Sequence, residues 1–136
     1  MALELATRST SDVLELWNEA LHHVAKKRGG PQLIETIRGD VSDDAMLDHL
    51  IAQGAFHLET DNSSIVGFAI VRQRVIEALY VRTDHRRRGC ARSMVNSLRR
   101  LDTAPIDALA LPGDRAMKSL YESFGWKARL LTMHVA

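Results

Sequence analysis

The chain has 136 residues, a formal net charge of +1 and 46% hydrophobic residues. This length suits one domain spanning residues 1–136. The apolar and charged fractions exclude a disordered, collagen-like or coiled-coil chain, and the balanced charge argues against a protein that holds nucleic acid over its whole surface. No apolar run is long enough to cross a bilayer, so we expect no membrane association.

A single cysteine, Cys90, cannot form an internal disulfide. The first residues lack the charged segment and apolar stretch of a secretory signal. Both observations favour a cytoplasmic location. The histidines are scattered without the spacing of metal ligands, and we expect no metal site.

Cap residues and apolar spacing predict the first half of the chain. Residues 3–5 alternate in polarity, which indicates a strand. A helix capped by Thr10 should follow, then a short helix opened by Pro31 and a third helix capped by Ser42, which Gly54 ends.

The second half changes from the helical period to the period of strands. We expect strands at 55–60, 65–71 and 75–81, a helix at 89–101, a strand at 106–111, a helix capped by Asp114 and closed by Gly125, and a last strand at 128–135. An antiparallel meander followed by a strand–helix–strand–helix–strand run predicts a mixed α/β (α+β) sheet flanked by helices.

The segment from Val75 to Ala91 is the most informative, because a predicted strand runs into a basic turn that opens a helix. Unpaired N–H groups and the positive end of the dipole make a helix start an anion site. Gly89 and the small Ala91 let a ligand approach the backbone closely. Four arginines add charge for phosphate oxygens: Arg86, Arg87, Arg88 and Arg92. A solvated basic helix start with a glycine bend would look the same.

This segment resembles the acyl-CoA-binding motif of the GNAT N-acetyltransferase superfamily. Arg86-x-x-Gly89-x-Ala91 is similar to that family's Arg/Gln-x-x-Gly-x-Gly/Ala, and residues 76–81 look like its central strand. Downstream, Asp114-x-x-Met117-x-x-x-Tyr121-Glu122-x-Phe124-Gly125-Trp126 resembles the family's Asn-x-x-Ala-x-x-x-Tyr-Glu-x-x-Gly-Phe. The two motifs occur in order, and the predicted secondary structure matches the family's across nearly the whole chain. The resemblance implies a mostly antiparallel central sheet that splays at its central strands.

The resemblance also implies acetyl-CoA as donor and a primary amine, on a small molecule or a protein, as acceptor. The pyrophosphate is expected on the backbone of the basic turn, and the pantetheine arm along the central strand. The positions expected to bind acetyl-CoA are Leu79, Tyr80, Val81, Arg86, Arg87, Arg88, Gly89, Cys90, Ala91, Arg92 and Asp114. Asp114 departs from the family's asparagine and brings a negative charge, which puts its direct contact in question. Cys90 at a helix start invites a nucleophile interpretation, but its motif position is apolar and packing is favoured.

Two residues are candidates for acid–base chemistry. Tyr121 matches the family position that protonates the CoA thiolate, although a core tyrosine would look the same. Glu77 lies in the central strand among apolar neighbours and is a candidate base, with a salt bridge as the alternative. Some family members place an acid where this chain has Leu109, which cannot accept a proton. Asp107 or a water chain are the other options.

We therefore expect an acyl-CoA-dependent N-acetyltransferase. The alternatives are an acyl-CoA-binding sensor without turnover and a nucleic-acid-binding domain that uses the arginines. Few aromatics and the balanced charge weigh against nucleic acid. An uncovered edge at the last predicted strand favours a homodimer. Residues 25–44, the expected acceptor groove, carry both signs of charge and favour no acceptor class.

Overall fold

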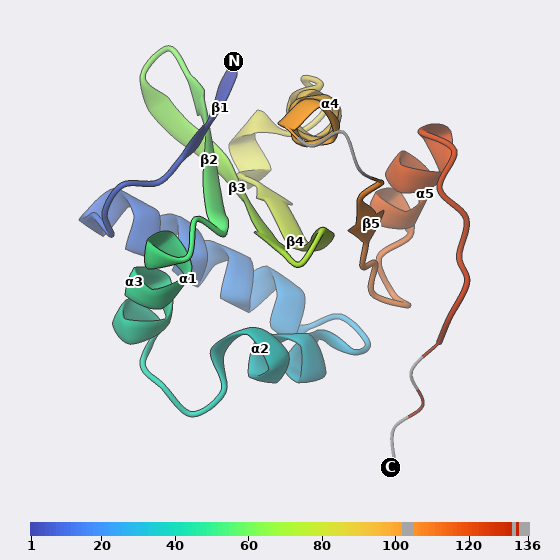
Figure 1. Ribbon diagram of the computed structural model, residues 1–136, viewed down its shortest axis with the longest axis horizontal. Helices are drawn as coiled ribbons and strands as arrows, with labels where there is room; N and C mark the ends of the chain where they lie inside the picture. Colours follow the sequence, from blue (N-terminus) through green and yellow to red (C-terminus); the bar gives the residue numbers. More distant parts are fainter. Residues whose placement is uncertain (102–104, 132, 134–136) are drawn as a thin grey trace.

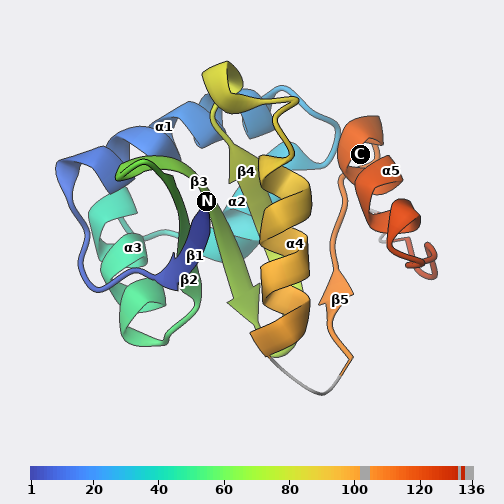
Figure 2. The same ribbon diagram turned by 90° about the horizontal axis from the view of Figure 1, so that it is seen from above.

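The computed structural model describes residues 1–101, 105–131 and 133, which form a five-stranded sheet with helices on both faces (Figures 1 and 2). The elements are β1 (Ala2–Leu5), α1 (Ser11–Ala25), α2 (Gly30–Arg38), α3 (Asp43–Ala52), β2 (Phe56–Asp61), β3 (Ser64–Arg72), β4 (Val75–Val81), a 3₁₀ turn (Thr83–His85), α4 (Cys90–Leu101), β5 (Asp107–Ala108) and α5 (Arg115–Ser123). The predicted fold class, a mixed sheet flanked by helices, is confirmed.

The strands lie in the order β1-β2-β3-β4-β5. The first four pair antiparallel, while β5 runs parallel to β4. The strand predicted over 106–111 is real but shorter, since β5 spans only Asp107–Ala108. A parallel strand needs a crossover connection, and α4 provides it between β4 and β5.

The helix starts were predicted correctly because each depends on a contact only three residues long. The side chains of Thr10, Ser42 and Asp114 each accept a hydrogen bond from the backbone N–H three residues later. Each cap satisfies one of the N–H groups that a helix start leaves without an internal partner.

Helices lie on both faces of the sheet (Figure 2), and an apolar layer fills the space on each face. Helices α1, α2 and α3 pack against one face, around Trp17, Phe56 and Phe68. On the other face α4 and α5 contribute Met94 and Tyr121. None of the helices in the described ranges is long and apolar enough to cross a membrane.

One acid, Glu59, is buried within the second layer. Its exposed fraction is 0%, and neither carboxylate oxygen has a hydrogen-bond partner among the described residues. Glu59 is opposite Gly67 in the β2–β3 register, and a Cβ on Gly67 would meet the Met94 sulfur of α4 at 3.3 Å, so both face α4. Loss of solvation raises the pKa of Glu59.

The last predicted strand, at 128–135, was wrong for the residues that the structure describes there. Residues 128–131 and 133 form no strand, and the other positions of that prediction lie outside the described residues. Leu130, Leu131 and Met133 are 90%, 76% and 85% exposed. An alternating apolar pattern predicts a strand only where a neighbouring strand is available to pair with it.

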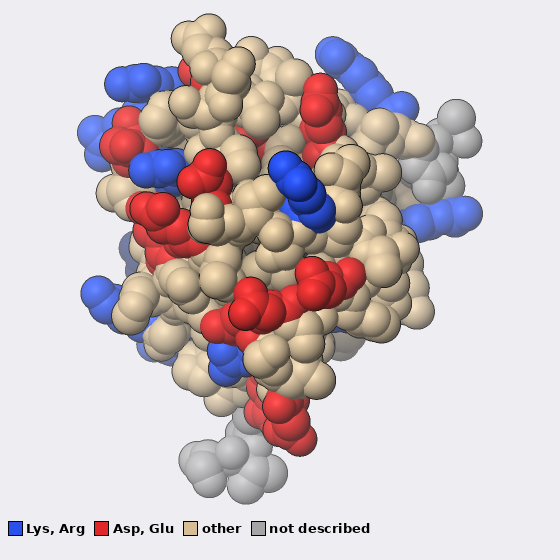
Figure 3. All heavy atoms as spheres, turned by 90° about the vertical axis from the view of Figure 1, so that its left-hand side faces the viewer, with Lys and Arg blue, Asp and Glu red and all other residues tan. Residues whose placement is uncertain are grey.

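The face that holds α3 and the start of α1 carries both acidic and basic side chains (Figure 3). This view therefore shows no continuous basic surface of the kind that binds a nucleic-acid backbone.

Candidate active site

A cavity of about 470 Å³ lies where the end of β4, the start of α4, the last turns of α1 and the first turns of α5 meet. It gathers all but one of the predicted acetyl-CoA positions: Leu79, Tyr80, Val81, Arg86, Arg87, Gly89, Cys90, Ala91, Arg92 and Asp114. The exception, Arg88, is exposed and does not line the cavity. Segments that are distant in sequence therefore meet around one hollow.

The sheet opens beside this cavity because β4 and β5 pair over only one end of β4. Val75 and Ile76 are opposite Asp107 and Ala108. The last backbone contact is the N–H of Leu109 donating to the carbonyl of Ile76 at 2.9 Å. Beyond Ile76, β4 has no strand partner on that side among the described residues, and the predicted splay is present.

The register of β4 decides which backbone groups face the opening. The N–H of Arg82 donates to Val66 of β3 at 2.8 Å. Because backbone groups alternate along a strand, Tyr80 also faces β3, and Leu79 and Val81 point away from it. Leu79 and Val81 therefore offer backbone groups to the cavity, as an extended ligand arm would require.

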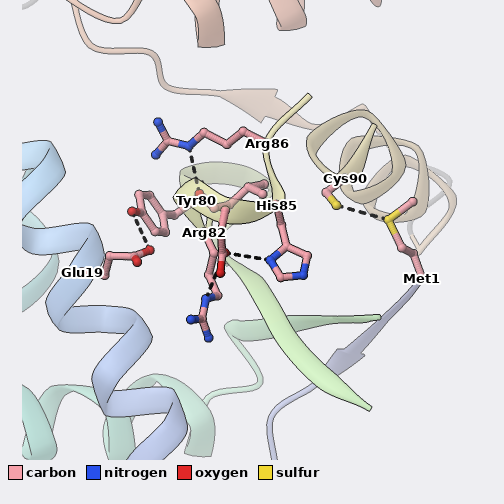
Figure 4. A network of polar contacts seen from close by, with 9 residues as sticks. Met1, Glu19, Tyr80, Arg82, His85, Arg86 and Cys90 are labelled. Atoms are coloured by element: carbon pink, nitrogen blue, oxygen red, sulfur yellow. Dashed lines mark hydrogen bonds and ion pairs between the residues drawn. The ribbon is translucent and has the colours of Figure 1, made fainter. Parts of the chain in front are cut away.

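Arg86 already forms a hydrogen bond with one of these backbone groups. Its Nε donates to the Val81 carbonyl at 3.2 Å, and its guanidinium lies 5.4 Å from the centre of the Tyr80 ring (Figure 4). The remaining guanidinium nitrogens stay available for an anion at the rim of the cavity.

The turn before α4 has the geometry of an anion site. Arg87 and Gly89 both have left-handed backbone, with φ of 63° and 79°. The first backbone hydrogen bond of α4 runs from Ser93 to the carbonyl of Gly89 at 2.9 Å. The N–H groups of residues 90–92 have no acceptor among the described residues, and all three residues line the cavity.

Cys90 is a buried, free thiol at the base of this turn. Its Sγ contacts the Met1 sulfur at 3.3 Å (Figure 4). Loss of solvation, with Glu59 adding to it, raises the pKa of Cys90. A nucleophilic cysteine needs a lowered pKa, so the packing role is the better interpretation.

Asp114 lines the cavity without leaving its charge unopposed. Its carboxylate caps α5 through the N–H of Met117 at 3.1 Å, and Lys27 Nζ lies 4.0 Å from the same oxygen. Lys27 lines the cavity as well. Lys27, just after α1, therefore offsets the acidic charge that counted against this position in the sequence.

Tyr121 lies behind the cavity wall rather than in it. Met117 and Leu120 of the same helix line the cavity, while Tyr121 is 5% exposed and packs edge-on against Trp126 with ring centres 5.3 Å apart. The Tyr121 hydroxyl has no hydrogen-bond partner among the described residues. It is not completely buried, so part of its surface stays accessible to solvent. Burial, with Asp114 adding to it, raises the pKa of Tyr121, which keeps its proton in place.

Glu77 does not line the cavity. The β3–β4 register shifts between Ile70, opposite Ala78, and Val71, opposite Ile76, so Glu77 is the extra residue of a β-bulge. Both of its carboxylate oxygens accept hydrogen bonds from Arg72. Glu77 therefore forms a salt bridge with Arg72, the alternative to a base role that the sequence analysis gave. Asp107, the other candidate acid, is exposed on β5 and also lies outside the cavity.

Sequence reasoning missed the contribution of α1. His23 and Val24 of α1 line the cavity, as does His85 beside the basic turn, whereas Lys27, which also lines it, lies within the range 25–44 expected for the acceptor groove. His85 lies inside the motif and could have been singled out, but nothing in the local pattern of α1 points toward a strand about 57 residues away. Among the described residues no group of three His, Cys, Asp or Glu could hold a metal ion.

The chain is similar to a known protein family. Residues 25–132 match the family model described as acetyltransferase (GNAT) domain. No curated protein matches the chain.

Several solved structures share the fold. The ribosomal-protein-alanine N-acetyltransferase from Brucella melitensis biovar Abortus 2308 is 18% identical with a TM-score of 0.70, over 99% of both chains. The aminoglycoside N-acetyltransferase AAC(6')-Iy, bound to the bisubstrate analogue CoA-S-monomethyl-acetylneamine, is 14% identical with a TM-score of 0.62, over 100% of this chain and 99% of that one. The aminoglycoside antibiotic 6'-N-acetyltransferase AAC(6')-IG from Acinetobacter haemolyticus is 14% identical with a TM-score of 0.60, over 100% and 97%.

Proposed function

Since the chain belongs to the GNAT acetyltransferase family and is therefore an acyl-CoA-dependent N-acetyltransferase, we propose that it moves an acetyl group from acetyl-CoA to a primary amine by direct attack. The observation that carries this proposal is the junction of an unpaired strand edge with an open helix start in one cavity. Leu79 and Val81 supply the edge, and the turn at Gly89 supplies the helix start. Together they suit a ligand with an extended amide arm and a pyrophosphate.

Each end of the donor then has residues suited to it. Arg86, Arg87 and Arg92 surround the helix start and would hold the phosphates. Leu79 and Val81 would pair with the pantetheine amides. A backbone N–H of this stretch would polarise the thioester carbonyl, because a fixed dipole stabilises the developing oxyanion without reorganising.

The acceptor nitrogen loses two protons during the reaction. The amine must lose the first before its lone pair can attack the thioester carbon, since the pKa of an alkylamine is about 10.4. As the C–N bond forms and the C–S bond breaks, Tyr121 gives its proton to the departing thiolate, and the attacking nitrogen, now positively charged with two protons, releases one of them to the Tyr121 phenolate and becomes the neutral amide. The motif position of Tyr121 and its unpartnered hydroxyl support this role, while the raised pKa of Tyr121 makes it a weaker proton donor. The sequence predicted Glu77 as the base, but Glu77 does not line the cavity and Arg72 occupies both of its carboxylate oxygens, so its position does not support that role.

Only the structural neighbours suggest a class of acceptor. One structural neighbour is named for a ribosomal-protein alanine and others for aminoglycosides. We propose to test both with purified protein, acetyl-CoA, sisomicin, neamine and a peptide with N-terminal alanine, following free thiol and product mass. Acetylated product with one equivalent of CoA supports the proposal. Acetyl-CoA binding without product from any amine would instead favour a sensor.

Two further expectations stay proposals. We propose a cytoplasmic location, on the grounds given by the sequence. A homodimer also stays a prediction, although the strand edge from which the sequence predicted it is absent from the described residues, and light scattering is the direct measurement. A single species of 15.2 kDa across a wide concentration range would refute it.

A further inference from the structure

His23 of α1 faces the strand edge that the proposed donor would use. It lines the cavity, and its ring lies 5.7 Å from the ring of Tyr80, tilted by 58°. Tyr80 is itself fixed, because its hydroxyl donates to Glu19 of α1 at 2.8 Å (Figure 4). The contacts of Tyr80 with α1 therefore hold the imidazole beside Leu79 and Val81, whose backbone groups open to the cavity.

Of the candidate bases near the cavity, His23 has both ring nitrogens without a hydrogen-bond partner among the described residues. The Nδ1 of His85 is 2.8 Å from Asp84 Oδ1, which leaves only its Nε2 to accept a proton, and the Glu77 carboxylate is held by Arg72. A base must reach the proton that it removes and must have a free lone pair to accept it.

Charges from every neighbouring element act on this imidazole. Burial lowers the pKa of His23, and Arg86 from the basic turn and Lys27 and Lys26, just after α1, lower it further. Asp114, before α5, acts in the opposite direction. Glu19 is engaged by Tyr80. Together these effects favour the neutral imidazole, whose lone pair can take up a proton.

We infer that His23 is the general base of this site and takes the proton from the acceptor ammonium. This inference rests on the proposed function, since it concerns the same cavity and reaction. An imidazole nitrogen accepts one proton from R–NH3⁺, which leaves R–NH2 to attack the thioester carbon. The imidazolium then returns that proton to solvent. The neighbouring cations favour this release, because they disfavour a second positive charge.

The test compares two adjacent histidines. His23→Gln removes the titrating group, and His22→Gln is the matched control, because His22 is exposed on the same helix and does not line the cavity. The acceptor is whichever of sisomicin, neamine and the N-terminal alanine peptide the wild-type protein acetylates. We expect His23→Gln to lower kcat/KM at pH 7 by about 10²-fold or more, with the KM for acetyl-CoA unchanged. The loss should shrink as pH rises and free amine becomes available. His22→Gln should match the wild type.

A second measurement does not depend on turnover or on the stability of a variant. In histidine side-chain NMR of the wild-type protein, the His23 signal is identified by its absence from the spectrum of a His23 variant or by through-bond assignment. The pKa of this imidazole should lie below the usual value of about 6.5. Saturation with acetyl-CoA should shift its resonances.

The outcomes separate the two ideas. If the wild type acetylates none of the amines, the proposed function fails and the inference fails with it. If it does acetylate one, the inference is overturned by a His23→Gln protein that keeps the acidic limb of the wild-type profile. It is also overturned if His85→Gln abolishes the acidic limb of the pH–rate profile instead. The same holds if saturation with acetyl-CoA does not shift the His23 resonances.

Discussion

The substitution Gly89→Glu tests the anion site at the start of α4 most directly. Gly89 has left-handed backbone, with φ of 79°, and a Cβ built there would meet nothing within 4 Å. Any side chain at this position therefore adds backbone strain of about 1–2 kcal/mol without a steric clash. A glutamate also adds a negative charge at the rim of the cavity. The matched variant Gly89→Ala carries the strain alone, so the difference between the two isolates the charge.

The size of that difference follows from Coulomb's law. Two unit charges 4 Å apart repel by about 1 kcal/mol in water and about 4 kcal/mol at an effective dielectric constant of about 20. The cavity is open to solvent, so an intermediate value applies. Since about 1.4 kcal/mol is a tenfold change in affinity, we expect Gly89→Glu to bind acetyl-CoA about 10- to 100-fold more weakly than Gly89→Ala.

Calorimetric titration with acetyl-CoA measures both affinities, and thermal unfolding measures the strain. Gly54→Glu is the control for a glutamate on left-handed backbone elsewhere, because Gly54 has φ of 68°, equally open space and no place in the cavity lining. It should lower the melting temperature and leave affinity unchanged. Equal affinities for Gly89→Glu and Gly89→Ala would refute the assignment of this turn to the phosphates.

Three other predictions concern single side chains. Tyr121→Phe should lower kcat by about 10²-fold or more while acetyl-CoA affinity and the melting temperature change little; wild-type turnover would make Tyr121 a core residue only. Glu77→Gln should lower stability about as much as Arg72→Gln does, because either change breaks the same ion pair; loss of the acidic limb of the pH–rate profile in Glu77→Gln alone would return the base role to Glu77. Glu59→Gln should raise the melting temperature at pH 7.5 and change it less near pH 4, as measured by calorimetry. The raised pKa of Glu59 means that the folded protein binds the extra proton, so wild-type stability falls as pH rises from the ordinary glutamate pKa through the raised one. An equal effect at both pH values would contradict that sign.

The sequence by itself determined the order of the elements as far as α5 and the place of the basic turn before α4. Thr10, Ser42 and Asp114 cap their helices through contacts three residues long, and such contacts are legible in a local window. The turn at Gly89 was legible for the same reason, since a glycine and several arginines at a strand-to-helix junction are adjacent in sequence. The motif around Tyr121 likewise follows the spacing of a single helix.

Only the tertiary structure decided which groups reach the cavity. A bulge at Glu77 pairs this acid with Arg72, and the β3–β4 register turns Leu79 and Val81 toward the opening. Strand register depends on which partner lies alongside, and a one-residue shift reverses every side chain. The short pairing of β5, the missing strand over residues 128–131 and the approach of His23 to β4 have the same origin. Each depends on packing between segments far apart in the chain, which no local pattern records.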